Sequence, residues 1–98
     1  MNNIIENLDK LLESRVRLGI MSVLTVNESV DFNSLKQMLN ITDGNLASHI
    51  SALEKAKYIK IKKKIIKKKT NTTYTISEQG KKAFLKHLEG LEKLINNK

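Results

Sequence analysis

The residues best suited to chemical recognition lie in the segment TDGNLASHISALEKAK, from Thr42 to Lys57. Leu46, Ile50 and Leu53 recur at the four-then-three spacing of one helical face, and Thr42 is a good N-cap for that helix. The opposite face is small, polar and nearly uncharged, so it can press against a flat polar surface. A DNA groove is one such surface. The alternative is an ordinary surface helix that happens to lack charge.

A helical wheel assigns the recognition face residue by residue. This face, opposite the apolar stripe, is expected to contact DNA. Its residues, together with Asp43 at the start of the helix and Lys55 at its basic end, are Gly44, Asn45, Ser48, Ser51 and Ala52. His49 lies about 60° from the apolar stripe, at the edge of that face. Two roles remain open for His49, a packing residue at the boundary or a reader of base edges.

A run of lysines follows this helix directly. The chain carries 18 Lys and Arg against 10 Asp and Glu, for a net charge of +8, and nine of those lysines lie between residues 55 and 76 with no acid among them. All the excess positive charge therefore sits in one short segment, which indicates a polyanionic partner. The lysines expected to meet phosphates are Lys60, Lys62, Lys64, Lys67, Lys68 and Lys69. The alternative is a solvated strand that serves solubility.

Composition excludes several classes of protein. At 98 residues the chain is expected to form one domain, and without cysteine it has no disulfide, thiolate metal site or cysteine nucleophile. No apolar run approaches the roughly 20 residues that span a bilayer, and the N-terminus is acidic and amphipathic rather than signal-like. A cytoplasmic protein with no membrane contact is expected.

No catalytic motif is visible. The sequence has no glycine-rich phosphate loop and no nucleophile elbow, and its two histidines, His49 and His87, stand on different predicted helices. We therefore predict no enzyme, no cofactor and no metal site. The sequence does not identify a small-molecule effector.

Periodicity predicts the elements that position these residues. Helical spacing predicts helices over residues 3–12, 15–26 and 34–39, with Ser14 and Asn33 as N-caps of the second and third, and a turn or very short strand near Val30. In the third helix Leu35, Met38 and Leu39 are expected to point inward.

After the central helix the period changes from 3.6 to 2. Alternation predicts strands over 58–66 and 72–76, with Ile59, Ile61 and Ile65 on one face of the first. The turn between them is expected at 67–71, which includes Thr70 and Asn71, and Ser77 is expected to cap a last helix over 78–95.

The order of these elements predicts an α+β fold that is mainly α. It is the order of a winged helix-turn-helix domain, with the helix-turn-helix at 33–57, a two-stranded hairpin wing at 58–76 and a long C-terminal helix at 77–97.

The last helix is longer than such a small domain can cover, and the N-terminal helix predicted within 1–13 has a similar surplus of apolar side chains. We expect a homodimer in which these terminal helices pack against their symmetry mates. The predicted interface residues are Ile4, Ile5, Leu8, Leu88, Leu91 and Ile95. The alternative is a long helix that lies back over its own domain.

Three segments resemble the short MarR/ArsR-like winged-helix transcriptional regulators: SRVRLGIMSVL, ITDGNLASHISALEKAKYI and TTYTISEQGKKAF. With their linkers they cover Ser14 to Phe84. The middle segment is similar to the recognition-helix pattern T-x-x-N-L-x-x-H-[LI]-x-x-L of that family, and YTISEQG is similar to its signature Y-x-L-T-x-x-G.

The resemblance implies a dimeric regulator that binds double-stranded DNA, with the recognition helix in the major groove and the wing over phosphate or minor groove. Carried over by position, the helix contacts would come from Thr42, Asn45, Ser48, His49 and Ala52. One departure concerns the wing tip, where relatives often place arginine with glycine or proline and this chain has KKKTN. Lysine meets phosphate as a point charge and reads a narrow groove less well than arginine.

Two rival functions stay open. A winged helix with a lysine-rich strand can bind structured RNA by shape, although the scarcity of stacking aromatic side chains argues against single strands. A protein-interaction module whose basic wing meets an acidic partner is the second rival.

Overall fold

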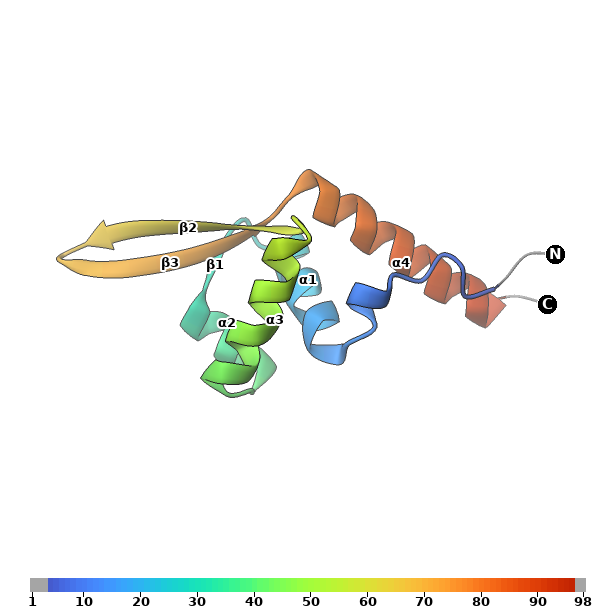
Figure 1. Ribbon diagram of the computed structural model, residues 1–98, viewed down its shortest axis with the longest axis horizontal. Coiled ribbons are helices and arrows are strands. Elements are labelled where there is room, and N and C mark those ends of the chain that lie inside the picture. The colour runs from blue at the N-terminus through green and yellow to red at the C-terminus, as the bar shows by residue number, and fades with distance from the viewer. Residues whose placement is uncertain (1–3, 97–98) are drawn as a thin grey trace.

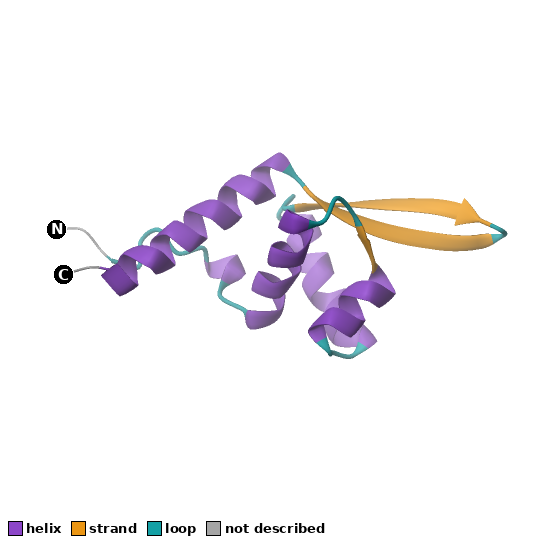
Figure 2. Cartoon of the chain, turned by 180° about the vertical axis from the view of Figure 1, so that it is seen from behind, coloured by secondary structure: helices purple, strands orange, loops and turns teal. Residues whose placement is uncertain are grey.

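The computed structural model describes residues 4–96. Its elements are a 3-10 helix η1 (Lys10–Leu12), α1 (Arg15–Val26), β1 (Val30–Asp31), α2 (Phe32–Leu39), α3 (Asp43–Lys55), β2 (Ile59–Ile66), β3 (Lys69–Ile76) and α4 (Glu78–Asn96). The long β2–β3 hairpin extends from one end of the molecule and α4 from the other, with α1, α2 and α3 between them (Figures 1 and 2). The predicted winged-helix architecture is confirmed.

The sheet has three strands rather than the two of the hairpin. The strand order is β1-β3-β2, and β1 joins through the antiparallel pairs Val30 with Tyr74 and Asp31 with Thr73. Thus the very short strand considered near Val30 exists, and it ties the start of the helix-turn-helix to the base of the wing.

The core lies where α1, α3 and the base of the hairpin meet. Its buried side chains come from every element of the domain body. They include Leu12, Ile20, Met21, Leu24, Leu35, Leu46, Leu53 and Ile59. The stripe predicted for the central helix is therefore the buried one, and the opposite face of α3 is left outside.

The N-terminal helix predicted over 3–12 is wrong within the described residues, and residue 3 lies outside them. Residues 4–7 form turns, and only Lys10–Leu12 make a single 3-10 turn. The physical reason is Asp9, whose backbone N–H donates to Nδ1 of His87 at 2.9 Å instead of to a helical carbonyl. The side-chain Oδ1 of Asp9 accepts a hydrogen bond from the backbone N–H of Leu11 at 2.9 Å. Asp9 therefore begins a new turn where the predicted helix would have continued.

The predicted cap of α2 is also corrected. Asp31, not Asn33, is the N-cap, since its Oδ1 accepts from the backbone N–H of Ser34 at 2.7 Å. The side-chain and backbone hydrogen bonds with Ser34 hold the pKa of the Asp31 carboxyl below its usual value. Met38, expected to point inward, is 58% exposed, because the short α2 turns only one side toward α1.

The hairpin turn is tighter than predicted. It contains only Lys67 and Lys68, and β3 begins at Lys69 rather than at residue 72. Ile65, expected on the apolar side of the wing, is 80% exposed, because the hairpin extends beyond the body and nothing lies beneath its outer half (Figure 1).

One junction joins α3, the wing and α4. Lys57 adopts a positive φ of 64° just after α3, and the N–H of Tyr58 reaches back to the carbonyl of Leu53 at 3.0 Å. This is a Schellman-type end that turns the chain into β2. Ser77 donates from Oγ to the carbonyl of Lys57 at 2.6 Å and accepts from the N–H of Gly80 at 2.9 Å. Ser77 thus caps α4, as predicted, and holds the base of the wing closed.

Candidate nucleic-acid interface

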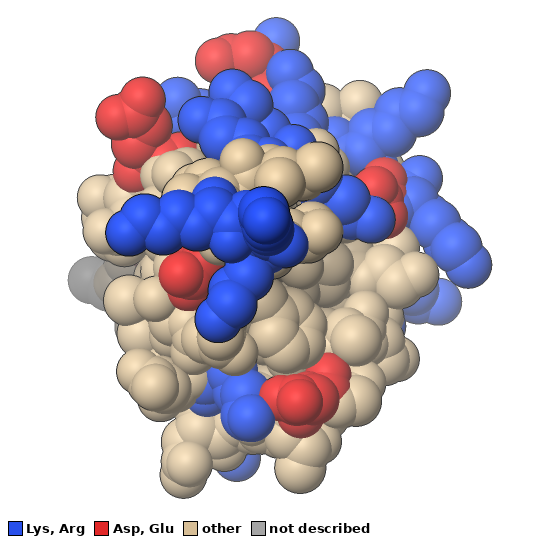
Figure 3. All heavy atoms as spheres, turned by 90° about the vertical axis from the view of Figure 1, so that its left-hand side faces the viewer, with Lys and Arg blue, Asp and Glu red and all other residues tan. Residues whose placement is uncertain are grey.

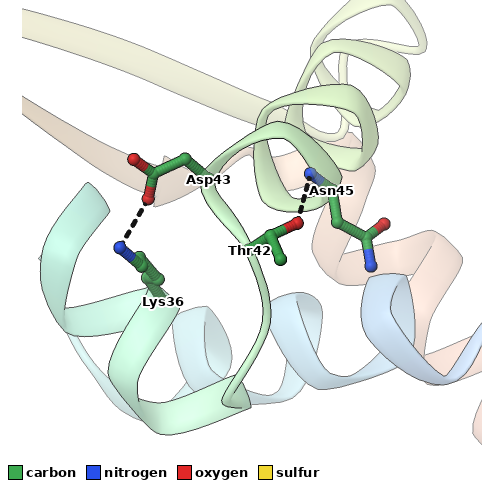
Figure 4. Close-up of polar contacts among 4 residues, drawn as sticks. All are labelled: Lys36, Thr42, Asp43 and Asn45. Carbon is green, nitrogen blue, oxygen red and sulfur yellow. Dashed lines mark hydrogen bonds and ion pairs between the residues drawn. The ribbon is translucent and has the colours of Figure 1, made fainter.

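The N-terminus of α3 is fixed by its cap. Thr42 Oγ1 accepts from the backbone N–H of Asn45 at 3.2 Å, and the helix runs from Asp43 (Figure 4). The helix keeps Leu46, Ile50 and Leu53 in the core. This arrangement turns the first exposed residues of α3 away from the body of the domain.

The predicted recognition residues lie together on the outside of α3. Thr42, Asp43, Gly44, Asn45, Ser48, Ser51 and Lys55 are exposed, and His49 and Ala52 are half-buried at the edge of the same face. The Asn45 amide points away from Thr42 (Figure 4). This face offers amide and hydroxyl groups on a slim helix, which suits contact with base edges in a major groove.

Asp43 lies on this face and its charge is paired. Nζ of Lys36, on α2, lies 2.7 Å from Oδ1 of Asp43, and Figure 4 shows the pair bridging the two helices. An unpaired carboxylate at this place would repel phosphates. The ion pair reduces that repulsion.

His49 accepts a hydrogen bond from a neighbouring helix. Nε of Arg17, on α1, donates to Nδ1 of His49 at 3.0 Å, and Nη1 of Arg17 donates to the carbonyl of Leu11 at 3.3 Å. Burial, and secondarily the positive charge of Arg17, lower the pKa of His49 below its ordinary value. The imidazole is therefore a packed ring at the border of the exposed face.

The wing presents its lysines in a regular row. Lys60, Lys62 and Lys64 lie on one face of β2, opposite Thr75, Thr73 and Asn71 of β3. All three lysines are exposed. Viewed toward the wing, basic side chains gather over the upper part of the molecule while the lower part is largely uncharged (Figure 3). A cationic hairpin thus follows a helix whose outer face is mostly small and polar.

The tip of the wing combines charge with backbone strain. Lys67 and Lys68 have φ values of 50° and 64°, as in a type I′ turn, where Asn-Gly is the preferred pair. Lys69 and Thr70 begin β3, and Asn71 pairs with Lys64. Lysine therefore occupies two positions that it fits poorly, and both side chains are exposed at the far end of the hairpin.

The residues predicted for a dimer interface lie away from this surface. Ile4 and Ile5 are each 57% exposed, Leu88 is 39% exposed and Ile95 is 82% exposed. Leu8 and Leu91 are half-buried, and a Cβ placed on Gly90 would lie 3.1 Å from Leu8 Cδ2. The N-terminal segment thus packs on α4 of its own chain and leaves apolar side chains outside.

Two partners of the candidate site escaped the sequence analysis. Arg17 stands 32 positions from His49, and Lys36 reaches Asp43 across the turn between two helices. Nothing in local periodicity signals either contact. Within residues 4–96, no group of three or more His, Cys, Asp or Glu side chains is placed to hold a metal ion. No helix in the described part of the chain is long and apolar enough to cross a bilayer.

Known proteins share this architecture. The winged helix DNA-binding domain family matches residues 16–95. An uncharacterised protein of Methanocaldococcus jannaschii is 36% identical over 88 residues, which is 90% of this chain and 96% of that protein. The structure of a transcriptional regulator homologue from Pyrococcus horikoshii superimposes with a TM-score of 0.85 and 31% identity, covering 95% of this chain and 90% of that one.

A more distant structure shares the fold alone. The MarR family transcriptional regulator Sco3205 of Streptomyces coelicolor, solved in complex with DNA, has a TM-score of 0.70 and 15% identity, over 97% of this chain and 66% of that one. The matched region of the family spans α1 through α4 and so contains the helix-turn-helix, the wing and most of the last helix. This chain belongs to the winged helix DNA-binding domain family and has the fold of MarR-like transcriptional regulators.

Proposed function

We propose that this protein is a cytoplasmic transcriptional regulator that binds specific double-stranded DNA as a homodimer. In this proposal α3 enters the major groove and the lysine-rich wing lies on the phosphate backbone. The observation that carries the proposal is that two unlike exposed surfaces lie on consecutive elements that contact each other, the nearly uncharged outer face of α3 and the lysine row of β2. Binding of a specific DNA sequence uses both surfaces, because the negative charge of DNA lies on the phosphate backbone and its sequence is read from the edges of the bases.

The two surfaces have separate tasks. Lys60, Lys62 and Lys64, with the tip lysines Lys67 and Lys68, supply affinity that is independent of sequence and sensitive to salt. Asn45 and Ser48 supply discrimination, since an asparagine amide can pair with both N6 and N7 of adenine. A serine hydroxyl both donates and accepts, so it adapts to either kind of base edge.

Salt dependence tests the phosphate contacts. If four wing lysines per subunit meet phosphates, a dimer neutralises about eight of them, and the logarithm of the association constant falls against the logarithm of salt concentration with a slope of about −7. Two half-sites separated by one helical turn, roughly 34 Å, are expected. A slope near zero would overturn the assignment of the wing lysines.

Selection of bound fragments from genomic DNA, followed by sequencing, tests sequence specificity. With the selected duplex, Ser48→Glu is expected to abolish specific binding, because a carboxylate would face the groove, while thermal unfolding stays unchanged at this exposed site. Lys86→Gln makes the same change in net charge on the exposed side of α4 and serves as the matched control. Equal affinities of the two variants would show that the wrong face of α3 has been assigned.

Exposed apolar side chains on α4 support the homodimer. Leu88 is exposed and lines a mostly apolar cleft of about 480 Å³ between α1 and α4, and Leu85 is exposed on the same helix. Exposed side chains of this size, grouped on one element, favour burial against a second copy. Sedimentation is expected to give a dimer for the wild type and a monomer for a variant with Leu88→Glu and Ile95→Glu.

The control for the dimer experiment is Met38→Glu, which places the same charge on an exposed apolar position of α2. It should remain dimeric. A wild-type monomer at concentrations that saturate the DNA would remove the homodimer from the proposal and leave the DNA contacts to be judged separately.

Competition experiments separate DNA from the rival partners. Labelled duplex DNA should be displaced by unlabelled duplex and not by structured RNA at equal salt. Displacement by RNA at equal concentration would favour an RNA-binding module. If the protein causes no electrophoretic mobility shift of the genomic DNA fragments, a protein partner for the basic wing would be favoured.

A further inference from the structure

The contact between Arg17 and His49 determines where the imidazole carries its proton. Arg17 Nε can only donate, so Nδ1 of His49, 3.0 Å away, must accept and hold no hydrogen. A neutral imidazole then carries its single proton on Nε2. His49 therefore has one defined tautomer in the folded protein.

Arg17 is itself held in place. Its Nη1 donates to the carbonyl of Leu11 at 3.3 Å, and its backbone N–H is bound by Oγ of Ser14, the N-cap of α1, at 3.3 Å. Both Arg17 and His49 are half-buried. The guanidinium therefore acts as a fixed donor on the domain side of the ring.

Neutrality of the ring follows from its surroundings. Burial lowers the pKa of His49, and the neighbouring positive charge of Arg17 lowers it further. Protonation of Nδ1 would also break the hydrogen bond with Arg17, because two N–H donors, Nδ1–H and the Arg17 Nε–H, would then face each other. The ring is accordingly uncharged at neutral pH and presents a polar N–H rather than a cation.

The second ring nitrogen of His49, Nε2, is not the one that faces Arg17. Nε2 is across the ring from Nδ1, so it points away from α1 when Nδ1 faces Arg17. Position 49 is one turn after Asn45 and one turn before Ala52, the two residues that border the exposed face. An N–H at Nε2 is therefore on the side of the ring away from Arg17, at a position one helical turn from the exposed Asn45.

We propose that Arg17 is a positioning residue for DNA recognition, which holds His49 as the Nε2–H tautomer so that α3 presents a hydrogen-bond donor to an acceptor on a base edge in the major groove. The inference rests on the proposed function. It assigns His49 both roles that the sequence left open, packing through Nδ1 and reading through Nε2. The major-groove acceptors that match are N7 of either purine, O6 of guanine and O4 of thymine, whereas the amino groups of cytosine and adenine are excluded because they are themselves donors.

Imidazole nitrogen spectroscopy of the free protein tests the first half of the inference. Long-range proton–nitrogen correlation spectra should show His49 protonated at Nε2 and unprotonated at Nδ1. In Arg17→Met, which keeps the aliphatic stem and removes the donor, a mixture of tautomers is expected, and Arg17→Lys should recover part of the wild-type pattern. Protonation at Nδ1 in the wild type, or an unchanged pattern in Arg17→Met, would overturn it.

Base discrimination tests the second half. With the selected duplex, single base pairs are changed in turn and affinities are compared for wild type, Arg17→Met, His49→Ala and His49→Gln. Loss of the donor should lower the preference for the selected base roughly tenfold at one base pair and should change the preference little at the other base pairs. His49→Gln should retain the preference, since an amide can accept from Arg17 and donate to the base. Unchanged discrimination in His49→Ala would overturn the reading role.

The slope of affinity against salt distinguishes positioning from direct charge contact. Arg17→Met should leave the slope unchanged, because no phosphate contact is removed. A slope shallower by about one per subunit would mean that Arg17 binds phosphate, which would overturn its positioning role. Failure of the wild type to bind any duplex would refute the proposed function instead, and the tautomer measurement would still stand.

Discussion

Nζ of Lys36 lies 2.7 Å from Oδ1 of Asp43, which joins α2 to the first residue of α3. The two side chains remain 41% and 71% exposed, so the pair adds little to the stability of the fold, about 0.2–1 kcal/mol. Its larger effect is electrostatic. It places a cation against the carboxylate at the exposed N-terminal end of α3.

Removal of this cation should weaken DNA binding. Lys36→Met leaves the Asp43 carboxylate unpaired where the DNA backbone approaches, so we expect affinity to fall by roughly tenfold at low salt and by less at high salt. Electrophoretic titration of the selected duplex at two salt concentrations measures both effects.

A double-mutant cycle separates repulsion by Asp43 from a direct contact of Lys36 with phosphate. If the loss comes from the unpaired carboxylate, Asp43→Asn in the Lys36→Met background should restore most of the affinity. If Lys36 binds phosphate directly, the second substitution will restore little. That second result would contradict the neutralising role of the pair.

The strained tip of the wing predicts a conflict between stability and binding. Lys68→Gly relieves the positive φ of 64° and should raise the free energy of unfolding by about 1 kcal/mol. It also removes a charge from each wing, so the slope of affinity against salt in a dimer should become shallower by about 1.8. Lys68→Gln, the control, removes the charge and keeps the strain. Equal unfolding free energies in the two variants would count against strain at the tip.

Substitution of two glycines by alanine should change the free energy of unfolding in opposite directions. A Cβ on Gly80 would lie 2.0 Å from the carbonyl oxygen of Tyr58, and backbone cannot move aside cheaply, so Gly80→Ala should lose about 3 kcal/mol of unfolding free energy. A Cβ on Gly44 would meet nothing within 4 Å, so Gly44→Ala should gain about 0.5–1 kcal/mol from helix propensity. Urea unfolding measures both, and a similar loss in each would contradict the packing of Gly80 against the wing junction.

Local patterns predicted those parts of the molecule that local interactions determine. The cap at Thr42, the buried stripe of α3 and the inward Ile59 and Ile61 at the base of β2 all follow from spacing within one element, and the structure has each of them. The side of α3 that stays exposed was predictable for the same reason, because the buried stripe leaves only one face outside.

Tertiary contacts determined the rest. The apolar spacing of residues 3–12 favours a helix, yet His87, 78 positions away, takes the N–H of Asp9 and ends the pattern there. The pairing of Val30 with Tyr74 and the contact of Arg17 with His49 likewise join distant parts of the chain. No periodicity within a single segment carries that information, which explains why the sequence predicts only a turn or very short strand near Val30 and does not reveal the role of Arg17.

The bond between Tyr58 and Asp9 gives the protein a specific response to high pH. Tyr58 Oη donates to Oδ2 of Asp9 at 2.5 Å, and burial first, then this bond and the carboxylate charge, raise the pKa of Tyr58 to about 12. The folded protein therefore holds the phenol proton more tightly than the unfolded chain, whose value is near 10. The resulting stabilisation is complete below pH 10 and is lost as the pH rises through 12.

Phenolate absorbance can follow this titration, because the chain has only two tyrosines. Burial, and secondarily Glu54, also raise the pKa of Tyr74, so Tyr58→Phe is needed to identify the remaining step. Asp9→Asn removes the charge and should lower the pKa of Tyr58 while burial keeps it above the ordinary value. In urea unfolding, wild type should lose stability relative to Tyr58→Phe between pH 10 and 12, since only the wild type must ionise this phenol. Parallel curves for the two proteins over that range would mean that Asp9 does not hold the Tyr58 proton in solution.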